Sequence, residues 1–110
     1  MDDRARRVGL NEALFRTVND EVRDVNKRFS VVAQPMSVVC ECERTDCYER
    51  IEVRLGEYER VRSDPTRFFV KPRHDAPDVE SVVERHERYW VVRKHEGEPA
   101  DLARRTDDQS

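Results

Sequence analysis

The sequence predicts one small α+β domain, made of a long N-terminal helix and a small, mostly antiparallel sheet with a metal-binding β-hairpin turn. Apolar residues recur every three or four positions from Leu10 to Phe29, which is the spacing of an amphipathic helix. Later segments alternate apolar and charged residues, as half-buried strands do. The chain's only cysteines, Cys40, Cys42 and Cys47, fall between two of these segments.

The expected N-terminal helix carries its apolar side chains on one stripe. The stripe consists of Leu10, Leu14, Phe15, Val18, Val22, Val25 and Phe29. Asn11 is a candidate N-cap. Two interpretations fit the stripe: it packs against the sheet of its own chain, or it forms a seam with a protein partner or a second copy. We expect residues 1–7, which precede the periodic region, to be a flexible N-terminus.

The strands are predicted from alternation and from turn residues. Ile51, Val53 and Leu55 alternate with charged residues, and Gly56 then breaks the strand. The segment before the cysteines is the partner strand of the expected hairpin, so the cysteines lie at the hairpin end. The expected strands cover residues 37–43, 49–55, 66–71 and 89–94.

Two further helices are expected in the second half of the chain. Residues 57–63 form a short helical turn, and a longer helix begins at Pro77, because proline suits the first helical position and acidic residues favour the helix N-terminus. The apolar face of this second helix carries Val79, Val82, Val83 and His86. From residue 95 the chain is polar and acidic, so residues 95–110 are expected to be a disordered tail. Residues 8–94 then form the single metal-stabilised domain.

Composition limits the size of the core and the kinds of partner. The chain has 110 residues, of which 41% are charged and 36% are hydrophobic, so it can build one modest core that a metal cross-link would strengthen. No run approaches the roughly 20 apolar residues that span a bilayer, and we expect no membrane association. The net charge of −3 disfavours nucleic acid as a partner.

The cysteines and His74 predict a metal site. Three thiolates and one imidazole make a closed tetrahedral ligand set of the kind that holds a structural Zn²⁺. Cys40 and Cys42 point to the same face of a strand, where their Cα atoms lie roughly 6.5–7 Å apart, at the outer limit for a disulfide. The number of cysteines is odd, and the N-terminus has no apolar signal core. We therefore expect a reducing, cytoplasmic location.

The fourth ligand and the metal each have alternatives. His74 lies in a turn and can swing toward the hairpin end, whereas His86 is expected on an apolar helical face, as a buried and hydrogen-bonded side chain. We expect His95 to be solvated. A water molecule, Asp46 or another carboxylate can also complete a zinc site.

An iron–sulfur cluster is the alternative to zinc, because three cysteines and one histidine also hold a [2Fe–2S] cluster. In Cys40-x-Cys42 and in this ligand set the chain resembles the CDGSH iron–sulfur proteins. It departs from them in the short gap to Cys47 and lacks Asp-Gly-Ser-His, which favours a single zinc ion. Three reduced cysteines without any metal are a further interpretation.

Several runs together form a family signature. They are Asn11-Glu-Ala-Leu-Phe-Arg-x-Val-Asn19, Cys40-Glu-Cys42 with Asp46-Cys47, Glu49-Arg-Ile-Glu52, Glu57-Tyr58-Glu59-x-Val61-Arg and Asp64-Pro65-Thr66-Arg67-Phe68. In these runs, over about residues 8–94, the chain is similar to a group of small uncharacterised actinobacterial proteins with a Cys-x-Cys-x4-Cys motif. The resemblance implies an actinobacterial source and a single domain, and it lends no activity.

Three classes of function fit these observations. The first is a small cytosolic zinc-stabilised interaction or regulatory module, with a protein partner or self-association through the N-terminal helix. The second is a thiol-based redox or zinc-responsive sensor, because metal-bound thiolates release the metal on oxidation. The third, a nucleic-acid-binding regulator, requires an arginine surface. That surface would consist of Arg50, Arg54, Arg60, Arg62, Arg67 and Arg73. The chain carries no HExxH, zinc-deaminase or phosphate-loop motif, and we do not expect an enzyme.

Overall fold

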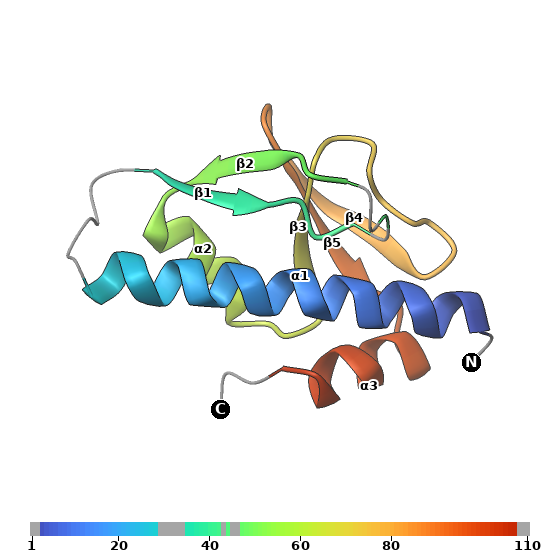
Figure 1. Ribbon diagram of the computed structural model, residues 1–110. Coiled ribbons are helices and arrows are strands. Elements are labelled where there is room, and N and C mark those ends of the chain that lie inside the picture. The colour runs from blue at the N-terminus through green and yellow to red at the C-terminus, as the bar shows by residue number, and fades with distance from the viewer. Residues whose placement is uncertain (1–2, 29–34, 43, 45–46, 108–110) are drawn as a thin grey trace.

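The computed structural model describes residues 3–28, 35–42, 44 and 47–107. The elements in these ranges follow the order α1 (Asp3–Arg28), β1 (Met36–Val39), β2 (Arg50–Val53), α2 (Leu55–Arg62), β3 (Arg67–Val70), β4 (Glu80–Arg85), β5 (Trp90–Lys94) and α3 (Glu98–Arg105). Figure 1 shows α1 running along the β1–β2 hairpin and α2, with α3 on its other side. The fold class is α+β, as the sequence predicts. Among the described helices, none combines the length and the apolar character needed to cross a membrane.

The β1–β2 hairpin follows from the alternation in its sequence. The two strands are antiparallel, with Met36 opposite Val53 and Val38 opposite Ile51. These four side chains are buried, whereas Glu52 between them is exposed, because successive residues of a strand point to opposite faces. The predicted hairpin is confirmed, and its strands are shorter than the predicted ranges.

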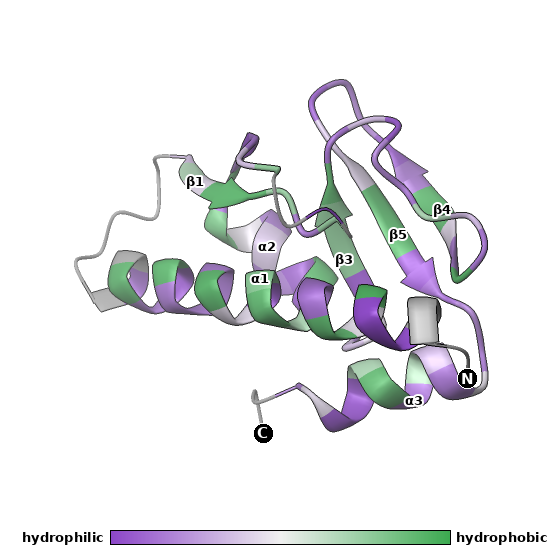
Figure 2. Cartoon of the chain, turned by 45° about the vertical axis from the view of Figure 1, so that its right-hand side comes forward, coloured by the Kyte–Doolittle hydropathy of each residue, from purple (hydrophilic) through white to green (hydrophobic). Residues whose placement is uncertain are grey.

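The second sheet is antiparallel throughout and has the strand order β3-β5-β4. Its centre is apolar, as the hydrophobic colouring of β3 and β5 in Figure 2 shows. Phe69 of β3 stacks on Tyr58 of α2, with ring centroids 5.4 Å apart, and Val91 and Val92 of β5 are fully buried. The sheet and α2 therefore share one core with the hairpin.

The helix predicted to begin at Pro77 is wrong, because residues 80–85 form the strand β4. Val82 pairs with Val92 of β5, and the register then shifts between Val82 and Glu84, so that Val83 is an extra residue in the ladder. Such a β-bulge breaks the two-residue alternation of a strand. The resulting spacing of the valines imitates a helical face, although their β-branched side chains favour a strand.

The apolar stripe of α1 was interpreted first as a surface that packs against the sheet of its own chain. For most of the stripe this is wrong. Most of the stripe faces outward, because Leu10, Leu14, Val18 and Val25 are 47%, 60%, 41% and 46% exposed. Val22 packs against the core. Asn11 lies inside the helix rather than at its N-cap. The helix begins at Asp3, within the segment predicted to be flexible, and Phe29 lies outside the described residues.

The face of α1 that points inward is largely polar. The buried polar residues of this face are Glu12, Arg16, Asn19 and Asp20. Asp20 accepts hydrogen bonds from Tyr58 at 2.6 Å and from Arg62 at 3.1 Å, and Arg62 also pairs with Asp107 at 3.1 Å. Arg16 donates to the backbone carbonyl of Ala103 at 2.8 Å. A buried polar group is stable only when its partners are present, so these bonds determine which face of α1 is covered.

A second buried ion cluster lies farther toward the N-terminus of α1. Lys94 of β5 donates to Glu12 of α1 and to Glu80 of β4, the latter at 2.9 Å. All three side chains are at most 1% exposed. Burial, followed by repulsion from Glu80, raises the pKa of Glu12 well above its usual value. The cluster ties the N-terminal half of α1 to the second sheet.

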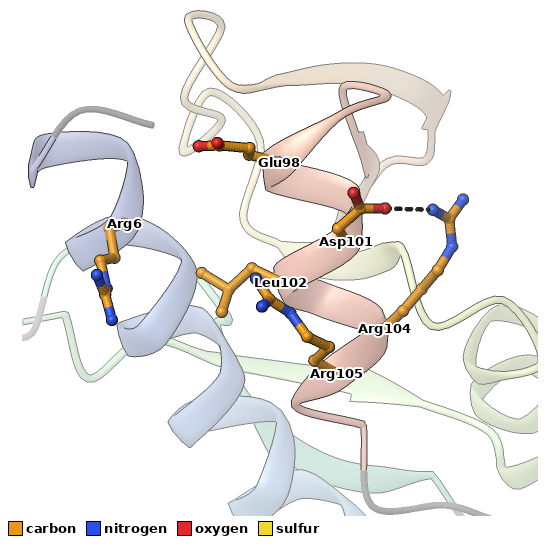
Figure 3. A pocket seen from close by; sticks show the side chains of 6 residues that line it. All are labelled: Arg6, Glu98, Asp101, Leu102, Arg104 and Arg105. Atoms are coloured by element: carbon orange, nitrogen blue, oxygen red, sulfur yellow. Dashed lines mark hydrogen bonds and ion pairs between the residues drawn. The ribbon is translucent and has the colours of Figure 1, made fainter.

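The C-terminal segment was predicted to be disordered, and this is wrong for residues 98–105, which form α3. Ala100, Leu102 and Ala103 are buried, and Figure 3 shows Leu102 pointing from α3 toward the first turns of α1. A side chain at Gly9 of α1 would place its Cβ only 2.6 Å from Leu102, so glycine permits the contact. The helix signals were present, with Pro99 near the start, acidic residues in the first turn and basic ones in the last. The segment was nevertheless predicted to be disordered, because its composition is polar and acidic.

A shallow groove of about 900 Å³ runs between the start of α1 and α3 (Figure 3). It is lined by Arg6, Glu98, Asp101, Leu102, Arg104 and Arg105. Arg104 pairs with Asp101 at 3.1 Å, so part of its positive charge is compensated. The lining carries both signs of charge and has no strong preference for an anion.

We expect Asp20→Ala to destabilise the protein by about 3 kcal/mol, because it leaves Arg62 and the hydroxyl of Tyr58 buried without their main partner. Asp24→Ala is the matched control on the same helix, since Asp24 is 59% exposed and a surface pair contributes little. Urea unfolding of the three proteins measures both changes. Equal stabilities of the Asp20 and Asp24 variants would contradict the structural role of the buried carboxylate.

Candidate metal centre

The four residues predicted to bind a metal lie together in the structure. Their ligand atoms, the sulfurs of Cys40, Cys42 and Cys47 and a ring nitrogen of His74, all lie within 4.8 Å of one another. Two of the cysteines follow β1, the third precedes β2, and the histidine lies in the connection between β3 and β4. The cluster therefore joins the end of the hairpin to the second sheet. Metal binding itself stays a prediction.

The two distances from His74 to the sulfurs of Cys40 and Cys47 match those of a tetrahedral zinc site. Zinc binds sulfur at about 2.3 Å and nitrogen at about 2.0–2.1 Å, so a tetrahedral angle places the two ligand atoms about 3.6 Å apart. The Nδ1 atom of His74 lies 3.6 Å from the sulfur of Cys40 and 3.7 Å from that of Cys47. These three ligand atoms are thus already spaced for one ion of this size.

Backbone amides support all three sulfurs. The Lys71 amide donates to the sulfur of Cys40 at 3.2 Å. The backbone amides of Arg44 and Glu49 likewise donate hydrogen bonds to the sulfurs of Cys42 and Cys47. Donors of this kind hold the ligands in place and favour their thiolate forms.

The electrostatics of the cluster suit a bound cation. A hydrogen bond from Cys40 lowers the pKa of Cys42 to about 5, whereas the hydrogen bond to Cys42, followed by burial, raises that of Cys40. Burial is also the main cause that raises the pKa of Cys47. Three negative charges cannot share one buried site without compensation. A divalent cation supplies that compensation and allows all three thiols to ionise.

The turn that carries His74 has an unusual backbone. The His74 amide donates to the carbonyl of Lys71 at 3.0 Å, which closes a four-residue turn with Pro72 and Arg73 at its centre. Arg73 has a φ of 69°, a left-handed conformation that favours glycine in the third position of a type II turn. Proline before it suits the second position. The turn accepts this strain and directs the imidazole toward the hairpin end.

The other candidate ligands lie elsewhere or are not described. His86 was expected on a buried helical face. It lies instead at the end of β4, where its Nε2 atom is 2.8 Å from the Glu84 carboxylate and its side chain is 41% exposed. His95 lies 3.1 Å from the hydroxyl of Ser81. Asp46 lies outside the described residues.

The sequence did not single out Glu41, which lies between two of the ligands and is fully buried. Its carboxylate accepts hydrogen bonds from the Phe69 amide and from the side chain of Asn19, both at 2.8 Å. Asn19 also exchanges two hydrogen bonds of 2.8 Å with the backbone of Val39. Burial raises the pKa of Glu41 to about 7. These bonds attach the hairpin end to α1 and to β3. No pattern in the sequence indicated this burial, because alternation places Glu41 on the face opposite the two cysteines.

Comparisons of the chain with family models, with curated proteins and with solved structures find no match. The class of protein is therefore defined by its own fold and site. It is a small α+β domain with a Cys3His cluster that can hold a metal ion.

We expect Arg73→Gly to raise the stability of the metal-loaded protein by up to about 1 kcal/mol, because glycine adopts a positive φ without strain. Arg73→Ala is the matched control, since it removes the same side chain and keeps the backbone penalty. Chemical unfolding of the two variants separates these effects. If both variants change stability equally, the side chain and not the backbone of Arg73 is what matters.

Proposed function

We propose that the protein is a small cytoplasmic zinc-stabilised interaction and regulatory module with a structural Cys3His site. The spacing of the four ligand atoms carries this proposal, because it suits one tetrahedral ion. Four protein ligands fill the coordination sphere and leave no position for a substrate. We therefore assign a structural and not a catalytic role to the metal.

The position of the cluster explains how one ion stabilises the whole fold. The hairpin and the three-stranded sheet are separate sheets, and the cluster joins them through Cys40, Cys42 and Cys47 on one side and His74 on the other. The apolar supply of the chain is modest. Metal binding adds folding free energy in such domains, and reduced thiols are required for it, which supports a cytoplasmic location.

Zinc is favoured over a [2Fe–2S] cluster by the compactness of the ligand set. A two-iron cluster distributes its four protein ligands over two metal atoms, which requires a wider arrangement than one ion does. Here a single nitrogen of His74 lies at the spacing of a shared ion from the sulfurs of both Cys40 and Cys47. One metal ion can therefore bind His74 together with both of these cysteines.

The sensor is the second candidate, and the burial of the sulfurs argues against it. Cys40 and Cys42 are fully buried and Cys47 is 9% exposed, whereas oxidation favours accessible thiolates. The lowered pKa of Cys42 is the one property that a sensor shares with this site.

A nucleic-acid-binding role is disfavoured because three of the arginines that it would need are paired with carboxylates. Arg62 is buried against Asp20, and Arg60 and Arg67 both pair with Glu84. Charges compensated in this way contribute little to a phosphate-binding surface.

We expect one zinc ion per chain and a colourless protein when the protein is purified without a metal-affinity tag, because Zn²⁺ has a filled d shell. His74→Ala removes a ligand and should weaken zinc binding by more than about 100-fold, exceeding the effect of losing a supporting residue. His86→Ala is the matched control. Elemental analysis and competition with a chromophoric chelator measure both. Absorbance above about 400 nm would instead indicate iron and sulfur.

We expect the metal-loaded protein to keep its zinc under mild peroxide, because its sulfurs are buried and metal-bound. Zinc release and thiol loss are followed together, with the fluorescence of Trp90 reporting any change of shape. The same protein in denaturant is the control, in which all thiols should react. Release in proportion to thiol loss, reversed by reduction, would establish the sensor instead.

A further inference from the structure

The outward face of α1 carries an aligned row of exposed apolar residues. We call it the outer stripe and define it as Leu10, Leu14, Val18 and Val25, which are 41% to 60% exposed. Successive helical residues are turned by about 100°, so the other three lie within about 40° of the direction of Leu14. The stripe extends over about 22 Å of helix, and Figure 2 shows hydrophobic bands recurring along α1.

The outer stripe points directly away from the core. Glu12 and Arg16 of the buried face lie about 160° from Leu14 around the helix, and both are at most 1% exposed. The bonds of that polar face hold α1 in this orientation, so the stripe cannot be buried by rotation of the helix. Single exposed apolar residues are common, but an aligned row of them indicates an interface.

Two opposite charges lie on the same line as the stripe. Arg7 and Glu21 are exposed, and each is seven residues from Leu14, which is the heptad spacing of a helix–helix seam. By the same helical geometry, both lie within about 20° of its direction. Neither makes an ion pair or a side-chain hydrogen bond with any other residue in the part of the chain that the structure describes.

We propose that the outer stripe binds a second copy of this chain, with the two α1 helices antiparallel and their two-fold axis at Leu14. This proposal rests on the interaction role proposed above and names its partner. In this register each residue faces the residue whose number completes a sum of 28. Leu14 meets Leu14, Leu10 meets Val18, and Arg7 meets Glu21 of the other copy. The last two contacts occur twice, as two-fold symmetry requires.

Charge selects this arrangement over its alternatives. A parallel pair would place Arg7 beside Arg7 and Glu21 beside Glu21, and like charges at facing positions repel. Moving the antiparallel axis to residue 16 would place Arg7 against Val25. Of these arrangements, the register centred on Leu14 pairs Leu14 with Leu14, Leu10 with Val18 and Arg7 with Glu21, and it leaves Val25 outside the apolar pairs, opposite residue 3. Because one helix face is smaller than a standard interface of about 1,600 Å², we expect a reversible dimer in the micromolar range.

The decisive experiment uses charge exchange in the zinc-loaded full chain, with sedimentation velocity over a range of concentrations. Arg7→Glu and Glu21→Arg should each weaken dimerisation by about tenfold or more, because each creates two like-charge contacts. An equimolar mixture of these two variants should form a heterodimer, in which all four end charges are complementary. The double variant should also dimerise like the unmodified chain.

Leu14→Glu is the complementary test, because it places two carboxylates on the symmetry axis and should abolish the dimer. Leu14 is 60% exposed, so the fold should survive, and circular dichroism checks this. A monomeric unmodified chain at high micromolar concentration, or a dimer unaffected by Leu14→Glu, would overturn the proposal. Failure of the mixture to associate would overturn the antiparallel register.

Zinc content, measured on the same samples, separates the two proposals. A monomer with one zinc ion per chain would refute the dimer and leave the structural zinc site standing. A dimer without zinc would refute the metal and leave the interface standing.

Discussion

The buried carboxylate of Asp20 determines how the longest helix sits on the rest of the protein. It accepts hydrogen bonds from Arg62 and Tyr58 of α2, and Arg62 in turn pairs with Asp107 beyond α3. Breaking a buried ion pair leaves an uncompensated charge in a medium of low polarity, which is strongly unfavourable. The polar face of α1 is therefore held inward even though the helix carries an apolar stripe. The exposure of that stripe is a consequence of this constraint.

The same face of α1 also positions the candidate metal centre. Asn19, one position before Asp20, bonds to the backbone of Val39 and to the carboxylate of Glu41, and the two cysteines on either side of Glu41 are thereby directed toward His74. The ligand cluster and the polar face are thus connected through one side chain. A small core becomes sufficient where polar contacts, together with the metal ion that we propose for the cluster, hold two separate sheets together.

Local patterns predicted the parts of the fold that depend on local geometry. The alternation around Ile51 placed the hairpin, because a half-buried strand has a two-residue period wherever it lies. The run Thr-Arg-Phe-Phe-Val-Lys placed β3, in which Phe68, Phe69 and Val70 are all buried, because a short run of aromatic and β-branched residues favours a strand. The bulge at Val83 in β4 broke that period and produced a false helix. In α3, proline and charge signals were correct, but the polar composition of the segment was given more weight.

The sequence by itself determined the α+β class, the hairpin and the candidate ligands Cys40, Cys42 and Cys47, because these follow from residue chemistry and short spacings. It left several candidates for the fourth ligand, and the tertiary structure placed His74 beside the cysteines. Only the tertiary structure decided which face of α1 is buried. The partners of its polar face lie far along the chain, since Asp20 and Arg62 are 42 positions apart. A helical period shows that two faces differ, but not which of them finds a complementary surface. That choice depends on contacts between distant segments. In this protein the polar face of α1 is the one that has hydrogen-bond partners elsewhere in the chain.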